Sequence, residues 1–147
     1  REMRPDAALT TALTVGFPGE PDTEFEKTLA FAEEMGFSRL HVFRYSARPG
    51  TPAATMDAQV APEVRAERSA RLRELGEAMA SAYAGTQLGR TVEVLVERTS
   101  ADGAAEGVTR EYVRARVPGA ALPAGSLASV NAERVEAGPV LVGRSLG

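Results

Sequence analysis

Hydrophobic residues in the first third of the chain follow two patterns, an unbroken apolar run and a helical repeat. Residues 7–15 (AALTTALTV) are apolar and rich in Thr and stop at Gly16, which predicts a strand buried on both faces. Residues 37–43 (FSRLHVF) predict a second strand, with a helix between the two. This order of strand, helix and strand is typical of a βαβ unit, in which the two strands run parallel.

The helix between the two strands is indicated by its ends as well as by its repeat. Thr23 and Glu26 have the spacing of a capping box, in which each side chain bonds to the backbone at the other position. Gly36 is well placed to end the helix as its C-cap. Three apolar residues at helical spacing would face the core: Phe25, Leu29 and Ala32.

The segment after the second strand has no hydrophobic period until a long helix begins. Residues 44–61 are rich in Pro, Ala and Gly, and a loop of this length is often functional. Pro62 then opens a helix of strong helix formers, which is expected to reach about Ala84 and to end at Gly85. Its apolar stripe consists of Val64, Leu72, Leu75, Met79 and Tyr83.

The hydrophobic period changes from helical to alternating after Gly89. In TVEVLVE, three valines occupy every second position, as in a strand with one face in a core. Turns containing Gly and Pro separate several such short segments, and together they predict a small antiparallel barrel. Strands are expected at residues 91–97, 111–117, 126–135 and 139–144, and a turn at residues 98–107.

The chain is therefore expected to have an α/β part followed by an all-β part. We assign residues 1–61 to the end of a larger parallel sheet or (β/α) barrel, residues 62–86 to a linking helix, and residues 87–147 to the small β-barrel. A single βαβ unit has too few strands to bury strands that are apolar on both faces. We expect the chain to be a fragment whose earlier strands are missing, and its open strand edge to favour aggregation or pairing with another chain.

Composition narrows the possible chemistry. The 147 residues are 44% hydrophobic and 25% charged, as in soluble globular domains, and the net charge of −3 does not by itself indicate a nucleic-acid-binding protein. No apolar run is long enough to span a bilayer and no signal peptide is visible, so we expect a cytoplasmic protein. The absence of Cys excludes disulfides, thiolate zinc sites and Cys-ligated iron–sulfur clusters within these residues.

Two motifs follow the predicted parallel strands, at the carboxyl ends where α/β folds bind ligands. VGFPGE contains Gly16, which permits a close approach of the backbone to a ligand, and Glu20, which can accept a hydrogen bond. The same residues also suit an ordinary strand-to-helix turn. FRYSARPGTP offers Arg44 and Arg48 to phosphate and Tyr45 to a base, although a solvated surface loop would look alike.

Two further features of the sequence are functional candidates. His41 lies within the second predicted strand, where an isolated His is most often structural, and no Ser–His–Asp or Cys–His set can be assembled. In EYVRARV, Tyr112, Arg114 and Arg116 would share the outer face of a strand. An aromatic residue beside arginines on a β surface is a recurrent way to hold RNA, and it is also compatible with a plain solvent-facing strand.

Taken together, these motifs resemble the C-terminal part of the tRNA methylthiotransferases, a radical S-adenosylmethionine family. TVGFPGE, GFSRLHVFRYSARPGTPAA, the long helix, GRTVEVLVE and the Tyr-Val-Arg strand occur in the order of that family and cover essentially the whole chain. The LHVF string favours the branch that acts on threonylcarbamoyl-adenosine beside the tRNA anticodon. The isopentenyladenosine branch and the ribosomal-protein branch usually differ there.

The resemblance implies a transferase that uses S-adenosylmethionine and two 4Fe-4S clusters, with tRNA as its partner and substrate. The six cysteines that would hold the clusters are absent from this chain, so the fragment is expected to be inactive without the N-terminal part of the protein. The resemblance also implies that the C-terminal barrel is a TRAM domain, a small RNA-binding barrel. Its tRNA binding would be sensitive to salt.

By position, the resemblance gives roles to the candidate residues. The cofactor-binding residues would be Gly16, Glu20 and Val42, the last through its backbone near the adenine. The substrate-binding and RNA-binding residues would be Arg44, Tyr45, Arg48, Tyr112, Arg114 and Arg116. Ala12 stands where the family often has Asp, so any contact of that Asp with S-adenosylmethionine is lost here.

Two alternatives to a tRNA-modifying enzyme remain open at this point. The first is a non-catalytic RNA-binding module with a vestigial α/β segment, which would bind tRNA without modifying it. The second is a different barrel enzyme whose β-barrel contacts protein, of which the ribosomal-protein branch of the same family is one version. Only the second predicts that tRNA binding is absent.

Overall fold

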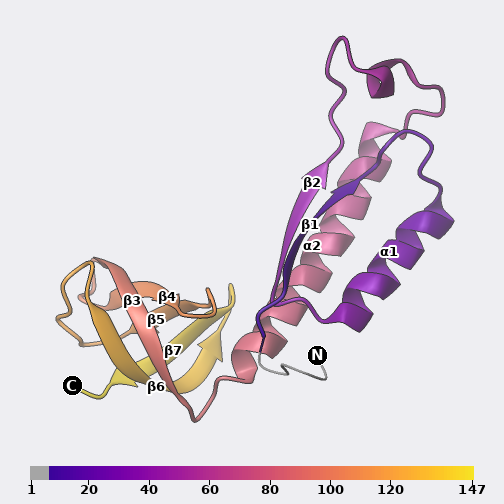
Figure 1. The fold of residues 1–147 in the computed structure, drawn as a ribbon. Coiled ribbons are helices and arrows are strands. Elements are labelled where there is room, and N and C mark those ends of the chain that lie inside the picture. The colour runs from indigo at the N-terminus through magenta and orange to yellow at the C-terminus, as the bar shows by residue number, and fades with distance from the viewer. Residues whose placement is uncertain (1–6) are drawn as a thin grey trace. The chain divides into compact units, whose positions relative to one another are not determined.

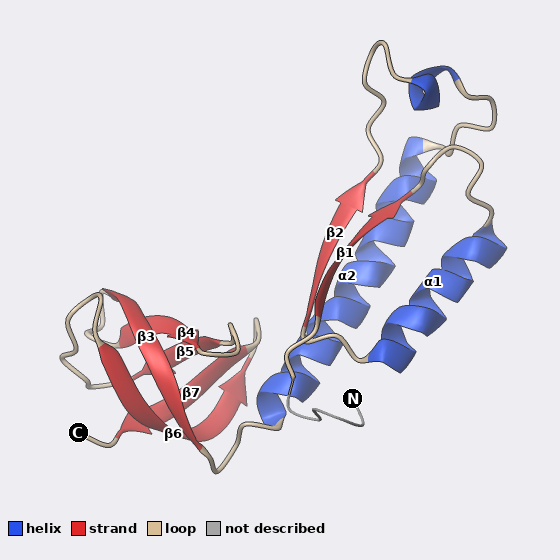
Figure 2. Cartoon of the chain, viewed as in Figure 1, coloured by secondary structure: helices blue, strands red, loops and turns tan. Residues whose placement is uncertain are grey.

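The computed structural model describes residues 7–147, which form two compact units (Figures 1 and 2). One consists of residues 9–79, and the other of residues 80–147 together with residues 7–8. The first unit contains parallel strands and helices, and the second is a β-barrel. The helix α2 (Pro62–Gly85) provides residues to both. Each unit has a hydrophobic core of its own.

The α/β unit contains the βαβ arrangement that the sequence predicts. Strand β1 (Thr10–Val15), helix α1 (Asp22–Met35) and strand β2 (Arg39–Arg44) follow one another, and β1 and β2 pair in parallel. A short 3₁₀ helix (Pro52–Thr55) interrupts the long loop before α2. The core of the unit brings together residues of both strands and both helices: Val15, Phe25, Ala32, Phe37 and Leu72.

The prediction that the first strand is buried on both faces is wrong. Exposed and less exposed positions alternate along both strands, because α1 and α2 pack against one face of the two-stranded sheet (Figure 2). The other face carries exposed side chains of both strands, and the Phe43 side chain is 57% exposed. Thr10, Ala12, Thr14, Arg39 and His41 are the further exposed residues of this open face.

Helix α1 ends as predicted but begins differently. Gly36 adopts the left-handed conformation, and its N–H donates to the carbonyl oxygens of Ala32 and Glu33, which confirms it as the C-cap. The capping box is wrong, because the helix begins at Asp22 after Pro21 and has no side-chain cap. The Glu26 side chain, which the capping box would have used, forms an ion pair with α2 instead.

Helix α2 begins at Pro62 and ends at Gly85, as predicted. Leu72 and Tyr83 of the expected apolar stripe are buried, and Leu75 and Met79 pack against the core of the α/β unit. Gly76 lets α2 approach β2 closely, since a Cβ at this position would lie 3.2 Å from the Cβ of Leu40.

The second unit is a closed five-stranded barrel with the strand order β3-β4-β5-β7-β6, which confirms the expected small barrel. Alternate residues of its strands point inward, and Val94, Val96 and Val117 are almost completely buried. The strands are β3 (Thr91–Thr99), β4 (Ala105–Thr109), β5 (Arg114–Val117), β6 (Leu127–Glu136) and β7 (Val140–Ser145).

The barrel differs from the prediction in three respects. Ala105–Thr109 is a strand, although the sequence predicted a turn through residue 107. The barrel is not wholly antiparallel, because β5 and β7 pair in parallel where the barrel closes. The strand expected from residue 111 begins only at Arg114, since the chain turns at Thr109 to Tyr112.

We expect Gly107→Ala to destabilise the barrel strongly. A Cβ at this position would collide with the backbone carbonyl of Leu95 on the neighbouring strand, and overpacking of this kind costs roughly 1–3 kcal/mol or more. Gly85→Ala is the matched control, because no atom lies within 4 Å of its Cβ position. Urea unfolding would show a lower midpoint for Gly107→Ala alone, and equal midpoints for the two variants would contradict the packing argument.

Candidate functional site

The VGFPGE motif forms the turn that leaves β1, at the edge where both parallel strands end (Figure 1). Gly16 has a φ of 75°, a conformation that suits Gly, and its N–H donates to Glu20 Oε1 at 3.0 Å. The N–H of Tyr45, just after β2, donates to the Val15 carbonyl at 2.9 Å. The two predicted motifs therefore lie side by side, as their positions after parallel strands implied.

The carboxylate of Glu20 is held by a buried arginine of α2. Arg68 has a side chain only 6% exposed, and its Nη1 lies 2.6 Å from Glu20 Oε1 and 3.0 Å from the Glu20 carbonyl oxygen. Its Nη2 donates to Asp22 Oδ1 at 2.7 Å. Burial acts to lower the pKa of Arg68, but the hydrogen bonds to Asp22 and Glu20 outweigh burial and raise that pKa. Glu20 thereby fixes the shape of the turn.

A second arginine of α2 explains why residue 16 must be Gly. The aliphatic part of Arg65 packs directly against Gly16, so that any Cβ there would collide with Arg65 Cγ. The Arg65 guanidinium donates from Nη1 to the carbonyl oxygen of Tyr45 at 2.9 Å. Arg65 thus contacts the turn after β1 and the segment after β2 at once.

We expect Arg68→Met to destabilise the α/β unit by about 2–4 kcal/mol, because it leaves the part-buried carboxylate of Glu20 without its cation. Arg73→Met is the matched control, because Arg73 is exposed on the same helix and has no ion pair among residues 7–147. This control should change the free energy of unfolding by less than about 0.5 kcal/mol. The urea unfolding midpoints of the two variants test the prediction. A midpoint for Arg68→Met that matches the control would mean that the buried ion pair does not stabilise the turn.

The segment after β2 lines a pocket of about 280 Å³. The pocket is formed by Arg44, Tyr45, Ser46, Pro62 and Arg65. Arg44 and Tyr45 therefore lie together, as the sequence suggested. Arg65 was missed, because it is one of many arginines in a charged helix, and only its place in the first turn after Pro62 could have drawn attention to it.

Tyr45 is less accessible than a base-stacking residue should be. Its ring contacts the ring of Phe17 edge-on at a centroid distance of 5.3 Å, and its hydroxyl is buried without a hydrogen-bond partner. Phe17 is the more exposed ring of the pair. Arg48 does not line the pocket, and its carbonyl oxygen accepts hydrogen bonds from Thr51 in the following turn.

The remaining candidates of the α/β unit lie on β1 and β2. Val42 packs against the core, so a ligand could meet it only through the backbone that the sequence analysis proposed. Ala12 and His41 are register partners on the open face, and both are exposed. Among residues 7–147, no catalytic partner set is assembled around His41, and its structural role stays a prediction.

The predicted RNA-binding stripe of the barrel is corrected by the structure. Tyr112 is 73% exposed but lies in the turn before β5 with a φ of 61°, because the N–H groups of Glu111 and Val113 bond to Thr109 Oγ1 and bend the chain. Arg116 is on the strand, where its guanidinium pairs with Asp102. Arg114 is exposed and has no ion pair within the described part of the chain.

An exposed apolar pair on the barrel was missed. Leu95 of β3 and Leu127 of β6 are register partners, and both side chains are exposed. They occupy outward positions of alternating strands, where the pattern led us to expect polar residues. The signal was present in the sequence, since TVEVLVE has Leu at a position that its neighbours fill with Glu.

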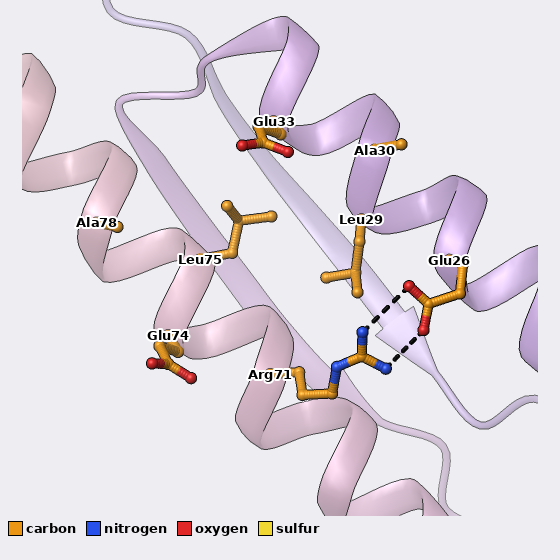
Figure 3. Close-up of a pocket in the computed structure, with 8 residues that line it drawn as sticks. All are labelled: Glu26, Leu29, Ala30, Glu33, Arg71, Glu74, Leu75 and Ala78. Atoms are coloured by element: carbon orange, nitrogen blue, oxygen red, sulfur yellow. Dashed lines mark hydrogen bonds and ion pairs between the residues drawn. The ribbon is translucent and has the colours of Figure 1, made fainter.

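A groove of about 460 Å³ separates α1 and α2 on the helical side of the first unit (Figure 3). Leu29 and Leu75 point into it from the two helices, and Arg71 closes one end through two hydrogen bonds to Glu26, at 2.6 and 3.1 Å. The hydrogen bond from Arg71 lowers the pKa of Glu26. These contacts hold the two helices together, and the residues that line the groove do not form a recognisable catalytic arrangement.

We expect Arg71→Gln to raise the pKa of Glu26 towards its ordinary value of 4.5. The wild-type pKa is lower in the folded than in the unfolded chain, so the pair stabilises the fold above pH 4.5 and is lost as the pH falls through the folded value. An NMR titration of the Glu26 carboxyl would measure the shift. An identical titration curve in wild type and variant would contradict the assigned cause.

Two classes of site are not found among residues 7–147. No helix in this range combines the length and the apolar character that crossing a membrane requires. The same residues contain no group of three or more His, Cys, Asp or Glu side chains that could hold a metal ion.

Comparison with known proteins identifies similar sequences. No family model matches the chain. It is 50% identical over 99 residues to a protein of Erythrobacter litoralis, 52% over 96 residues to one of Thermobifida fusca, and 45% over 128 residues to one of Clavibacter michiganensis. These matches cover 67%, 65% and 86% of this chain, but only 22%, 19% and 24% of the relatives. The chain thus spans a quarter or less of their length.

All three relatives carry the name tRNA-2-methylthio-N(6)-dimethylallyladenosine synthase. The similarity agrees with the resemblance to tRNA methylthiotransferases drawn from the sequence motifs. The finer assignment is not supported, because the relatives are named for dimethylallyladenosine, whereas the LHVF string favoured threonylcarbamoyl-adenosine. That single string was too short a basis for choosing a branch.

Proposed function

We propose that the chain is the C-terminal region of a tRNA methylthiotransferase that acts on N6-dimethylallyladenosine. The observation that carries the proposal is the identity of 45–52% to proteins of that name over 96–128 residues. The exposed rings of Phe17 and Phe43 at the strand ends support the choice of branch. They suit an apolar dimethylallyl group better than a polar threonylcarbamoyl group.

The α/β unit would complete the pocket for S-adenosylmethionine and for the target nucleoside. In this proposal the backbones of Gly16 and Val42 approach the cofactor, and Glu20 keeps the turn in place through Arg68. Both motifs end at one edge of the parallel pair, where α/β folds bind their ligands. The barrel would be the TRAM domain that holds tRNA.

The iron–sulfur clusters of the proposed enzyme do not fit the residues present. The chain has no Cys, and its described part offers no alternative cluster of ligands. When bound, the clusters and S-adenosylmethionine would supply the radical chemistry and the methylthio group. Their thiolate ligands would have to come from residues other than these 147, and the chain alone would bind tRNA without modifying it.

Deletion of the gene that encodes the chain tests the proposed activity. Mass spectrometry of tRNA nucleosides should show loss of 2-methylthio-N6-dimethylallyladenosine and accumulation of N6-dimethylallyladenosine. Loss of the methylthio group from threonylcarbamoyl-adenosine would support the other branch and contradict ours. Unchanged methylthiolation with retained tRNA binding by the chain would favour the non-catalytic RNA-binding module, for which the absence of Cys is the supporting observation.

We expect Arg114→Gln to weaken tRNA binding by the chain about three- to tenfold at low salt and to reduce the salt slope by roughly 0.9, the loss of one phosphate contact. Arg134→Gln is the control, because Arg134 is already paired with Glu136 at 2.8 Å. Fluorescence anisotropy with an anticodon stem-loop at several salt concentrations would measure both quantities. Equal slopes for the two variants would remove Arg114 from the proposed RNA-binding surface.

A further inference from the structure

We propose that Arg44 and Arg65 form a phosphate-binding pocket that holds one phosphodiester of the bound RNA. The two arginines come from separate elements, the end of β2 and the first turn of α2, and they line the same pocket of about 280 Å³. The Ser46 hydroxyl group offers a further donor at its wall. The identification of the ligand as RNA rests on the proposed function.

The charge of the pocket is uncompensated. None of its lining residues is acidic, and no ion pair involves Arg44 or Arg65 in the part of the chain that the structure describes. Arg68 and Arg71, on the same helix as Arg65, are both paired with carboxylates of the α/β unit. The chain thus neutralises the neighbouring arginines and leaves these two available to an anion.

Arg65 is also held in place before any ligand arrives. Its stem packs against Gly16, and its Nη1 donates to the Tyr45 carbonyl at 2.9 Å, so little side-chain entropy remains to be lost on binding. The planar guanidinium keeps further N–H donors, whose geometry matches two phosphate oxygens. Pro62 places the beginning of α2 at the pocket, where the helix dipole favours negative charge.

The place and the charge of the pocket indicate the kind of anion. Its volume of about 280 Å³ has room for one phosphate group and lies just below the usual range of small-molecule sites. The pocket adjoins the carboxyl ends of β1 and β2, where the proposed function puts the target nucleoside. A phosphodiester next to that nucleoside would be clamped here and would fix its position.

Two variants test the pocket with matched controls. Arg65→Met keeps the stem that packs on Gly16 and removes the charge, and Arg44→Gln alters an exposed side chain. Each should weaken binding of an anticodon stem-loop by the chain about tenfold and reduce the salt slope by roughly 0.7–0.9. Arg39→Gln removes the same charge at the opposite end of β2 and should change neither. Urea midpoints close to wild type would show that the variants are folded.

A neutral methylphosphonate, placed at one backbone position of the stem-loop at a time, identifies the phosphate. At the position that the pocket holds, the substitution should weaken binding to wild type and have a smaller effect on Arg65→Met, in which only Arg44 still faces the phosphate. Unchanged affinity and salt slope in both variants would overturn the proposal. A loss of S-adenosylmethionine binding with intact RNA binding would also overturn it, since the pocket would then hold a carboxylate.

Inorganic phosphate separates this proposal from the proposed enzyme activity. NMR titration should shift the amide signals of residues 44–46 in wild type and leave them unchanged in Arg65→Met. If phosphate and RNA bind as expected while deletion of the gene leaves tRNA methylthiolation unchanged, the phosphate pocket is supported and the proposed enzyme activity is contradicted. If methylthiolation is lost on deletion but neither variant affects RNA binding, the enzyme activity is supported and the phosphate pocket is contradicted.

Discussion

The buried guanidinium of Arg68 is the interaction on which the geometry of the α/β unit depends. It bonds to the carboxylate and the carbonyl of Glu20, reaches Asp22 at the start of α1, and lies 5.5 Å above the ring of Phe25. Glu20 in turn holds the N–H of Gly16. One side chain of α2 thereby fixes both the turn after β1 and the beginning of α1. A buried charge is tolerated only with this set of partners, so the turn has little freedom to take another shape.

The elements that sequence predicted well are those whose pattern is set by local periodicity. The alternation of Val92, Val94 and Val96 marks β3, and Pro62 with a run of helix formers marks α2, without knowledge of what each packs against. Strand β4 was missed because AEGVT is short and contains Gly107, which sequence analysis assigns to turns. Here Gly is required by the close approach of the Leu95 carbonyl, a contact with another strand.

The candidate site shows the same limit more sharply. The two motifs after the parallel strands could be found from sequence, because parallel strands bring their carboxyl ends to one edge. Sequence could not predict which of the charged side chains at this edge remain available to a ligand. Arg65 and Arg68 lie three residues apart in one helix and look alike in the sequence, yet one is paired with carboxylates and the other bonds to a carbonyl. Likewise, the pairing of Arg116 with Asp102 depends on the barrel, not on the strand that carries Arg116.

The two units differ in whether their strands have open edges and faces, and the difference bears on the proposed function. The barrel closes on itself, with β5 and β7 pairing in parallel to complete the ring, so none of its five strands is left as an edge. The α/β unit has only β1 and β2, and Phe43 on their open face remains 57% exposed. Parallel sheets are normally covered by further structure on both faces. In the proposed enzyme that cover would be supplied by the strands of a larger barrel, and the ends of β1 and β2 would then face an enclosed, water-poor cavity. Arginines at such a position attract a phosphate more strongly than arginines in bulk solvent, which is the physical reason to expect the clamp of Arg44 and Arg65 at this edge.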